Sequence, residues 1–520
     1  MTTSLFPAPA NPRPATTEEI FNAVWRACDS FRGVIDPSSY KDYILTFLFL
    51  KYLSDLWDER RRFYEEKYAT DPERDLRVQR ALRHERFQVP DQSRYQYLYE
   101  CRDQDDIGEL INHALDSLED ANRAKLDKVF RGIDFASEAQ LGATKDMKRR
   151  LKHLIEDFRA IDLTPDHLTS QDVIGDVYEY LIERFASNAG KKAGEFYTPK
   201  AVSALLAQLV EPRPGDRICD PTCGSASLLI RTGQQVPNGG SFALYGQELN
   251  GATYALARQN CVLHFQDDAV LVQGDTLTNP LLTDGDRLLR FNVVVANPPF
   301  SLDKWGHETA AADPYRRFHR GLPPKSKGDF AFISHLVETM TETDGRGGVV
   351  VPHGVLFRGA AEGKIRRQLL EEGLIEAVIG LPANLFFGTG IPTAIILLRR
   401  QRPTTDVLFV DASRLYTDVR TRAMLMPEHA ARIVDVVKGF RQAGAAGPAG
   451  VLEPRLAYRA TLAELAANDF NLNIPRYVDT FEAEDTVDLP TVQAELHTLE
   501  QQLTDVRQRM QQYLKELSGN

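Results

Sequence analysis

Apolar and polar positions follow three different patterns along the chain. Before about residue 165, apolar residues such as Phe21, Val24, Trp25 and Cys28 recur at helical spacing, which predicts amphipathic helices. Short β-rich runs then alternate with helical stretches up to about residue 475, as a doubly wound α/β sheet requires. At 520 residues the chain also exceeds what one core usually serves. We therefore predict a helical N-terminal domain (1–165), a Rossmann-like α/β domain (166–480) and a C-terminal helical tail (481–520).

The predicted strands of the α/β region end in polar residues. The first runs from Arg217 into Asp220, and the next three end before Glu248, Asp275 and Asn297. The carboxyl ends of parallel strands share one sheet edge, where open α/β sheets bind ligands. A lone glycine-rich turn would be weak evidence for a site, but four polar strand ends in order predict one. Later strands are expected at 348–352, 375–381 and 393–398.

The run 291–296 ends in Asn297-Pro298-Pro299-Phe300. Neither proline has a backbone N–H, so the strand cannot continue through them. The loop displays an amide oxygen that can accept a hydrogen bond from an amino group, and a ring that can stack on a flat molecule. That combination suits a planar substrate with an exocyclic amino group, such as adenine. By itself the tetrapeptide is equally compatible with an ordinary strand-ending turn.

A loop of small residues follows the first strand. It reads Asp220-Pro221-Thr222-Cys223-Gly224-Ser225-Ala226, and a predicted helix begins directly after it. Small side chains let the backbone approach a ligand closely, and the first turn of a helix has free N–H groups. An acidic residue at the end of the second strand, here Glu248, commonly binds ribose hydroxyls in nucleotide-binding folds. The pattern predicts a nucleotide-like cofactor.

These motifs resemble those of the amino-group DNA methyltransferases that use S-adenosylmethionine: the loop from Asp220 is similar to their cofactor loop, and Asn297–Phe300 to their catalytic loop. Two further segments, 194–200 (GEFYTPK) and 470–478 (FNLNIPRYV), narrow the resemblance to the modification subunit of Type I restriction–modification systems. The likeness covers most of the chain. It departs at Ala226, where many members carry a second glycine, and we expect a negative φ there because alanine then still permits close approach.

The resemblance implies methyl transfer to adenine N6 in double-stranded DNA, with the target base flipped out of the helix. Asp220 would orient the loop or contact the methionine amino group, Glu248 would bind the ribose, and Asp275 would meet the cofactor's adenine. No metal ligand is expected. The implied catalytic residues are Asn297, Pro298, Pro299 and Phe300, and the implied cofactor residues are Glu195, Phe196, Tyr197, Thr198, Pro199, Lys200, Asp220, Gly224, Ser225, Ala226, Glu248 and Asp275.

The formal net charge of −11 indicates that partners take part. A self-sufficient DNA-binding protein usually has a basic face, whereas this chain has only local basic clusters within 316–327 and 364–367. Those clusters either contact phosphates or form solvated surface. The acidic balance favours a partner that supplies much of the DNA affinity.

The tail carries apolar residues at alternating three- and four-residue spacing from Leu489 to Leu517, typical of a heptad seam. This favours docking against a partner helix over packing of a single helix on its own domain. The resemblance implies that the partner is the specificity subunit, in a complex that contains a second copy of this chain. A motor nuclease subunit would join where cleavage is coupled.

No signal peptide is evident, and the apolar run 43–50 is too short to span a bilayer. Five scattered cysteines without a zinc-like spacing are expected to be buried reduced thiols, in a cytoplasmic protein.

Three alternative functions remain. N4-cytosine methylation is the closest, because its site chemistry is nearly identical. Enzymes that methylate a protein glutamine are usually smaller and lack the N-terminal region and heptad tail. A scaffold without activity would be expected to lose Asn297 or the cofactor loop, and both are present.

Overall fold

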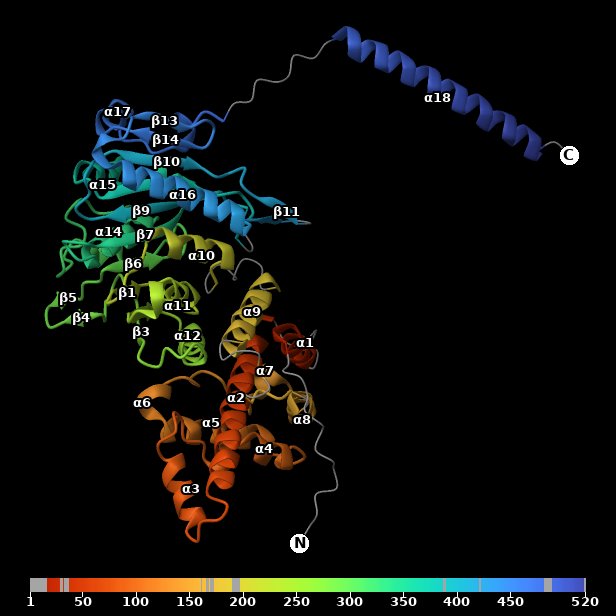
Figure 1. Ribbon diagram of the computed structural model, residues 1–520, viewed down its shortest axis with the longest axis vertical. Coiled ribbons are helices and arrows are strands. Elements are labelled where there is room, and N and C mark those ends of the chain that lie inside the picture. Colours follow the sequence, from red (N-terminus) through yellow and green to blue (C-terminus); the bar gives the residue numbers. More distant parts are fainter. Residues whose placement is uncertain are drawn as a thin grey trace. The chain divides into compact units, whose positions relative to one another are not determined.

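The structure is a computed structural model, and it describes residues 16–28, 31, 37–159, 161–164, 168, 173–188, 197–386, 390–419, 422–480 and 489–518. The chain divides into two compact units, Met1–Val478 and Asp479–Asn520 (Figure 1). Among the helices described, none has both the length and the apolar character that a membrane span needs.

The N-terminal region is helical, as predicted. Its first helix starts with a capping box, in which Thr16 Oγ1 accepts from the Glu19 N–H and the Glu19 carboxylate accepts from the Thr16 N–H. Buried rings such as Phe47 and Phe158 pack edge to face in its core. The helices are α1 (Thr17–Ala27), α2 (Pro37–Lys67), α3 (Arg74–Leu82), α4 (Tyr95–Cys101), α5 (Ile107–Ala121), α6 (Arg123–Leu126), α7 (Glu138–Leu141), α8 (Thr144–Arg159) and α9 (Val173–Asn188).

This helical core continues into the α/β region through α12 (Gly251–Leu263). Leu256, Val262 and Leu263 of α12 belong to the same buried cluster as the N-terminal helices. Buried Gln259 of α12 donates to Thr46 Oγ1 of α2 at 3.1 Å and accepts from the Tyr178 hydroxyl of α9 at 2.8 Å. The N-terminal helices are therefore fixed to the sheet region by apolar packing and by buried hydrogen bonds.

A ten-stranded sheet forms the centre of the first unit, in the order β13-β14-β10-β8-β9-β7-β6-β1-β2-β3 (Figure 1). Its strands are β1 (Arg217–Asp220), β2 (Ala243–Glu248), β3 (Val270–Gln273), β6 (Val293–Ala296), β7 (Arg346–Pro352), β8 (Ile375–Gly380), β9 (Thr393–Arg399), β10 (Val407–Asp411), β13 (Gly450–Glu453) and β14 (Ala457–Ala460). Two small hairpins lie outside it, β4 (Thr283–Asp284) with β5 (Arg287–Leu288), and β11 (Thr417–Val419) with β12 (Arg422–Met424).

The five strands from β3 to β7 along the sheet are mutually parallel, whereas β9 runs antiparallel between β7 and β8. Helices cover both faces, which confirms the doubly wound fold. One face packs against α10 (Lys200–Leu209), α11 (Ser227–Gln234), α12 and α16 (Pro427–Ala443), and the other against α14 (Asp329–Thr339), α15 (Ala360–Glu371) and α17 (Leu462–Ala467). The short helix α13 (His307–Ala310) follows the loop after β6.

Strand β6 shows why its sequence is uniformly apolar. Val293 and Val295 belong to the core on one face of the sheet, and Val294 and Ala296 belong to the core on the other. All four are fully buried. The prediction of a buried strand that ends before Asn297 is confirmed.

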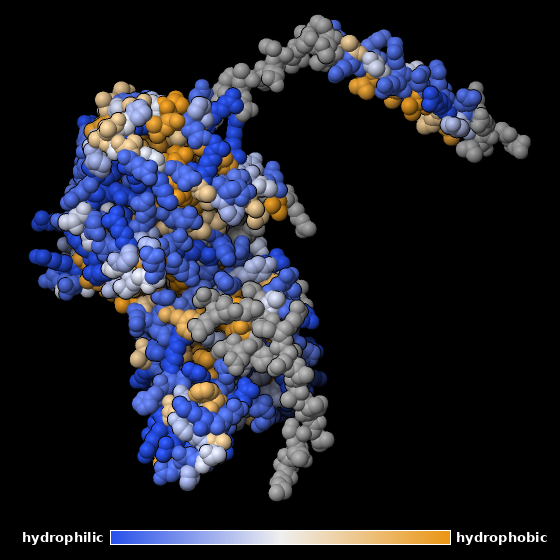
Figure 2. All heavy atoms as spheres, viewed as in Figure 1, coloured by the Kyte–Doolittle hydropathy of each residue, from blue (hydrophilic) through white to orange (hydrophobic). Residues whose placement is uncertain are grey.

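The second unit contains α18 (Leu489–Ser518). Figure 2 shows an apolar stripe along this helix. Its members are 51–64% exposed: Leu496, Leu499, Leu503, Val506, Met510, Tyr513 and Leu514. A stripe of this size on one helix favours contact with another apolar surface.

Candidate active site

Four neighbouring parallel strands, β6, β1, β2 and β3, end at the same edge of the sheet. Asn297 follows β6, Asp220 ends β1, Glu248 ends β2 and Asp275 lies just after β3. The chain winds outward from β1 in one direction through β2 and β3, and β6 lies on the other side of β1. The gap between β1 and β6 is thus a topological switch point, where open α/β sheets bind their ligands.

The Asn297 side chain is held by one partner and lacks another. Its Nδ2 donates to Thr198 Oγ1 at 3.0 Å, which brings the segment before α10 to the end of β6. Its Oδ1 is buried and accepts no hydrogen bond from any residue that the structure describes. An unpaired buried acceptor is costly and uncommon in folded proteins. A ligand with an amino group would satisfy it.

The rest of this loop presents rigid and aromatic surface. Pro298 is buried and Pro299 is exposed. The half-buried Phe300 ring packs edge to face against Phe386, with the ring centroids 5.8 Å apart. This contact orients Phe300 and leaves part of its surface uncovered.

The loop between β1 and α11 is fixed by side chains from neighbouring elements. Glu248 accepts from the Gly224 N–H at 3.0 Å and from the Asn250 N–H at 2.8 Å. Asn260 of α12 donates to the Ser225 carbonyl at 2.9 Å. Thr276, after β3, donates to the Pro221 carbonyl at 2.5 Å. Neither Asn260 nor Thr276 could be predicted from the sequence, because each lies far along the chain from the loop that it holds.

Ala226 corrects one prediction. We expected a negative φ, but Ala226 has φ +63° and lies in the left-handed region, as does Gly224 with φ +54°. Ala226 is the N-cap of α11 and its methyl group is fully buried. The turn therefore needs the conformation that glycine adopts most easily, and alanine adopts it at a cost in free energy.

Two acidic side chains make this edge receptive to positive charge. Burial and, to a smaller extent, the nearby Glu248 carboxylate raise the pKa of Asp220 to about 7, against hydrogen bonds from Thr222 that lower it. Burial also raises the pKa of Glu248. A cationic ligand would favour the ionised form of both carboxylates.

The Asp275 carboxylate accepts hydrogen bonds from the turn that follows it. One of its carboxylate oxygens accepts from the Leu277 N–H at 2.8 Å, and the other accepts from Thr278 Oγ1 at 2.8 Å. The first of these oxygens, Oδ1, also accepts from the Thr278 N–H at 3.4 Å. The other, Oδ2, can accept a second hydrogen bond, so a ligand contact is still open to it.

The predicted segment 195–200 is only partly described. Glu195 and Phe196 lie outside the described residues. Tyr197 is 5% exposed and belongs to the N-terminal core. Tyr197 and Lys200 line a cavity of about 550 Å³ together with residues of α1, α9 and α11. Pro199 is the N-cap of α10, and Lys200 is its first residue.

Part of each basic cluster is structural. Arg317 is buried and pairs with Asp313 at 2.7 Å, and Arg320 is buried and pairs with Glu338 and Glu372, each at 2.7 Å. These two arginines are therefore not exposed for contacts with phosphate.

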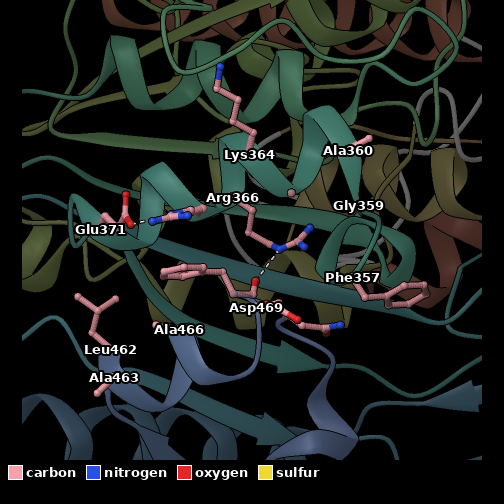
Figure 3. Close-up of a pocket in the computed structure, with 14 residues that line it drawn as sticks. Phe357, Gly359, Ala360, Lys364, Arg366, Glu371, Leu462, Ala463, Ala466 and Asp469 are labelled. Carbon is pink, nitrogen blue, oxygen red and sulfur yellow. Dashed lines mark hydrogen bonds and ion pairs between the residues drawn. The ribbon is translucent and has the colours of Figure 1, made fainter.

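The second cluster lines a cavity of about 1000 Å³ between α15 and α17 (Figure 3). Arg366 is buried there and donates to the Phe470 carbonyl at 2.8 Å, and Arg367 pairs with Glu371 at 2.8 Å. Lys364 is exposed.

All five cysteines are buried and form no disulfide, as expected: Cys28, Cys101, Cys219, Cys223 and Cys261. Burial raises the pKa of Cys219 and of Cys223 beside the cofactor loop, which keeps both as neutral thiols. In the part of the chain that the structure describes, no His, Cys, Asp and Glu side chains group in a way that could hold a metal ion.

Comparison with known proteins gives consistent matches along the chain. Residues 169–486 match the model of the N-6 DNA Methylase family, and residues 20–158 match that of the HsdM N-terminal domain. The methylase subunit of the Type I restriction enzyme MjaVIII from Methanocaldococcus jannaschii is 30% identical over 98% of this chain and 87% of its own length. The corresponding MpnII subunit from Mycoplasma pneumoniae is 28% identical over 95% of both chains.

A solved structure is also similar. The type I restriction-modification system methyltransferase subunit from Streptococcus thermophilus superposes with a TM-score of 0.78 and is 33% identical, and the match covers 90% of this chain and 100% of that one.

Replacing Ala226 with glycine should leave stability nearly unchanged. Relief of the left-handed alanine contributes about 1 kcal/mol, and loss of the buried methyl group costs about 0.8 kcal/mol. Ala207, buried inside α10, is the control. There the change to glycine should cost about 2 kcal/mol, because helix propensity and burial are lost together. Denaturant unfolding measures both, and equal losses would contradict the strained-turn interpretation.

Stability should depend on pH through Asp220. Its pKa of about 7 lies above the ordinary value of 3.8, so the folded state holds the proton more tightly. Its contribution to stability is therefore lost as pH rises from about 4 to about 7. The melting temperature of Asp220→Asn relative to the native chain should rise over that interval. Glu376→Gln is a control with the opposite sign. Arg441 and Arg399 lower the pKa of Glu376 against its burial, so its contribution to stability is lost as pH falls rather than as pH rises. A flat difference for Asp220→Asn would contradict the assignment.

Proposed function

The chain belongs to the N-6 DNA methylase family, as a Type I modification subunit that methylates adenine N6 in DNA, and we propose that the edge formed by β6, β1, β2 and β3 is where the transfer takes place. In this proposal residues 1–165 form a packing and docking domain, 166–480 carry the chemistry and 481–520 join a partner subunit.

The unpaired Asn297 Oδ1 carries the proposal. Adenine N6 is a poor nucleophile, because its lone pair is delocalised into the ring. Hydrogen bonds from the two N6–H groups to Asn297 Oδ1 and to the Pro298 carbonyl would favour a tetrahedral nitrogen and restore the lone pair. Phe300 would stack on the base after it leaves the duplex. Thr198 supports this role, because its hydroxyl accepts the hydrogen bond that Asn297 Nδ2 donates. The amide oxygen is then left for the substrate.

The β1–α11 loop fits S-adenosylmethionine, which supplies a methyl group on a positively charged sulfur. Gly224, Ser225 and Ala226 would lie against its methionine portion, where their small side chains permit close approach. The ionised Asp220 carboxylate would attract the positively charged ammonium group of the cofactor's methionine portion. Glu248 would accept from the ribose hydroxyls through its remaining lone pairs, and Asp275 would accept from its adenine amino group. These residues would hold the cofactor so that its methyl group is aligned with N6, and this positioning would lower the barrier to transfer.

The exposed stripe of α18 is the proposed contact with a specificity subunit. The heptad spacing supports a helical partner, and the net charge of −11 supports a partner that provides DNA affinity. A complex with two copies of this chain and, for cleavage, a motor nuclease completes the proposal. The buried free thiols are compatible with a reducing cytoplasm.

Cytosine N4 remains the nearest alternative substrate by chemistry. The N-6 family match favours adenine. The extent of the matches, which include residues 20–158, disfavours a protein-glutamine methyltransferase. Mass analysis of nucleosides, from unmethylated phage DNA treated with the chain and its co-purifying subunit, separates these products. N4-methylcytosine without N6-methyladenine would overturn the assignment.

Asn297→Ala should lower the single-turnover rate of methylation by roughly 100-fold, because one positioned acceptor is lost from the transition state. Affinity for S-adenosylmethionine should change little. Asn292, at the opposite end of the same run, is the control: its side chain accepts from the Arg217 N–H and donates to Asp344. Asn292→Ala should lower stability yet keep the rate per folded molecule. Near-native methylation by Asn297→Ala would refute the catalytic role of the loop.

Replacing Leu499 and Leu503 together with alanine should weaken association with the specificity subunit. Each buried Leu→Ala exchange costs about 2–5 kcal/mol, and every 1.4 kcal/mol is about tenfold in affinity. Cofactor binding to the isolated chain should be unaltered. The matched control replaces Gln501 and Gln508 with alanine. Both lie on the side of the helix opposite the apolar seam. Calorimetry of the two subunits measures the effect, and full affinity in the leucine variant would show that the tail is dispensable.

A further inference from the structure

Hydrogen bonds hold the catalytic loop, residues 297–300, at two places: at Asn297 and directly after Phe300. Ser301 has a φ of +51°, an uncommon conformation for a residue other than glycine. Its N–H donates to Asp329 Oδ1 at 2.8 Å. The next carbonyl, of Leu302, accepts from the Gly328 N–H at 2.8 Å. Residues 328 and 329 therefore clamp the strained exit of the loop.

Asp329 is buried, with 3% of its surface exposed, so its charge requires compensation. It is the first residue of α14, where the helix dipole favours a negative charge. Its Oδ2 accepts from Arg358 Nη2 at 2.6 Å. Asp329 thus joins a backbone N–H of the catalytic loop to a guanidinium from another part of the fold.

Arg358 is itself fixed on three sides. Its Nε contacts Glu362 Oε2 of α15 at 2.7 Å, and its carbonyl accepts from Arg366 Nη1 at 2.9 Å. Arg366 is the buried arginine in the wall of the cavity between α15 and α17 (Figure 3). Gly354 packs against the guanidinium, since a Cβ there would lie 3.3 Å from it. The chain of contacts runs from α15 through Arg358 and Asp329 to Ser301.

We propose that Asp329, held by Arg358, is a positioning residue that sets the path of the catalytic loop, and with it the Pro298 carbonyl and the Phe300 ring. The inference rests on the proposed function of that loop. Asp329 contacts neither reacting group in the proposal and acts only through Ser301. Because a displacement of about 1 Å in reacting geometry can cost on the order of 100-fold in rate, a clamp on the loop exit bears directly on methylation.

A purely structural role would give a different result, and the sheet contains a matched control. Asp216, just before β1 at the opposite edge, is also buried, accepts from the Arg213 N–H at 2.7 Å and pairs with buried Arg346. It has the same chemistry as Asp329 but lies far from the catalytic loop along β1 and β6. Loss of either carboxylate removes one buried ion-pair partner of an arginine, Arg358 or Arg346, and lowers stability.

The test compares Asp329→Ala with Asp216→Ala in the complex with the co-purifying subunit. Single-turnover formation of N6-methyladenine on unmethylated phage DNA should fall roughly 100-fold for Asp329→Ala and stay near the native rate for Asp216→Ala. Affinity for S-adenosylmethionine should be unchanged in both. Asp329→Asn, whose amide oxygen can still accept from Ser301, should recover part of the rate. Equal rates for the two alanine variants would overturn the proposal.

Hydrogen exchange gives a readout that does not need activity. The peptide containing residues 297–305 should exchange faster in Asp329→Ala and at the native rate in Asp216→Ala. Unchanged exchange of that peptide in Asp329→Ala would overturn the clamp. If the native complex forms no N6-methyladenine, the proposed function fails, and the exchange experiment still decides whether Asp329 holds the loop.

Discussion

Strand β6 cannot extend beyond Ala296, because the residues that follow Asn297 are two prolines without an N–H to donate. The strand is buried on both faces, so its position is set by two apolar cores. A rigid strand with an abrupt end delivers Asn297 to a fixed point beside β1. The polar contacts at this edge then hold loops rather than build the sheet: Thr198 holds Asn297, Glu248 holds Gly224 and Asp329 holds Ser301.

The sequence predicted the features that local pattern controls. Burial and proline chemistry located the end of β6, and the strand-end residues Asp220, Glu248 and Asn297 follow from the same logic. Strand β9 was predicted, but its antiparallel direction was not, because an apolar run does not indicate the direction of a strand in a sheet. Strands β10, β13 and β14 were missed, although β10 is as buried as its neighbours.

What escaped sequence reasoning depends on tertiary contacts. Thr198 was predicted as a cofactor residue, but its contact with Asn297, 99 residues away, was not, and neither was the contact of Asn260 with Ser225, 35 residues away. The sign of φ at Ala226 was wrong because the turn geometry overrides the preference of alanine. Charge alone could not separate buried Arg317 from exposed Lys364, since burial is decided by partners elsewhere in the chain. The site roles of individual residues stay predictions.

The two acceptors proposed for N6, Asn297 Oδ1 and the Pro298 carbonyl, match an amino group with two hydrogens. After one methyl transfer the nitrogen loses a proton to solvent and keeps a single hydrogen, so one of the two acceptors must again lack a partner. A site that hydrogen-bonds both N–H groups therefore discriminates against an amine that has lost one. The geometry that activates the substrate would therefore bind the methylated product more weakly. It would also oppose a second methylation. Release of the modified base and the limit of one methyl group would thus have the same cause.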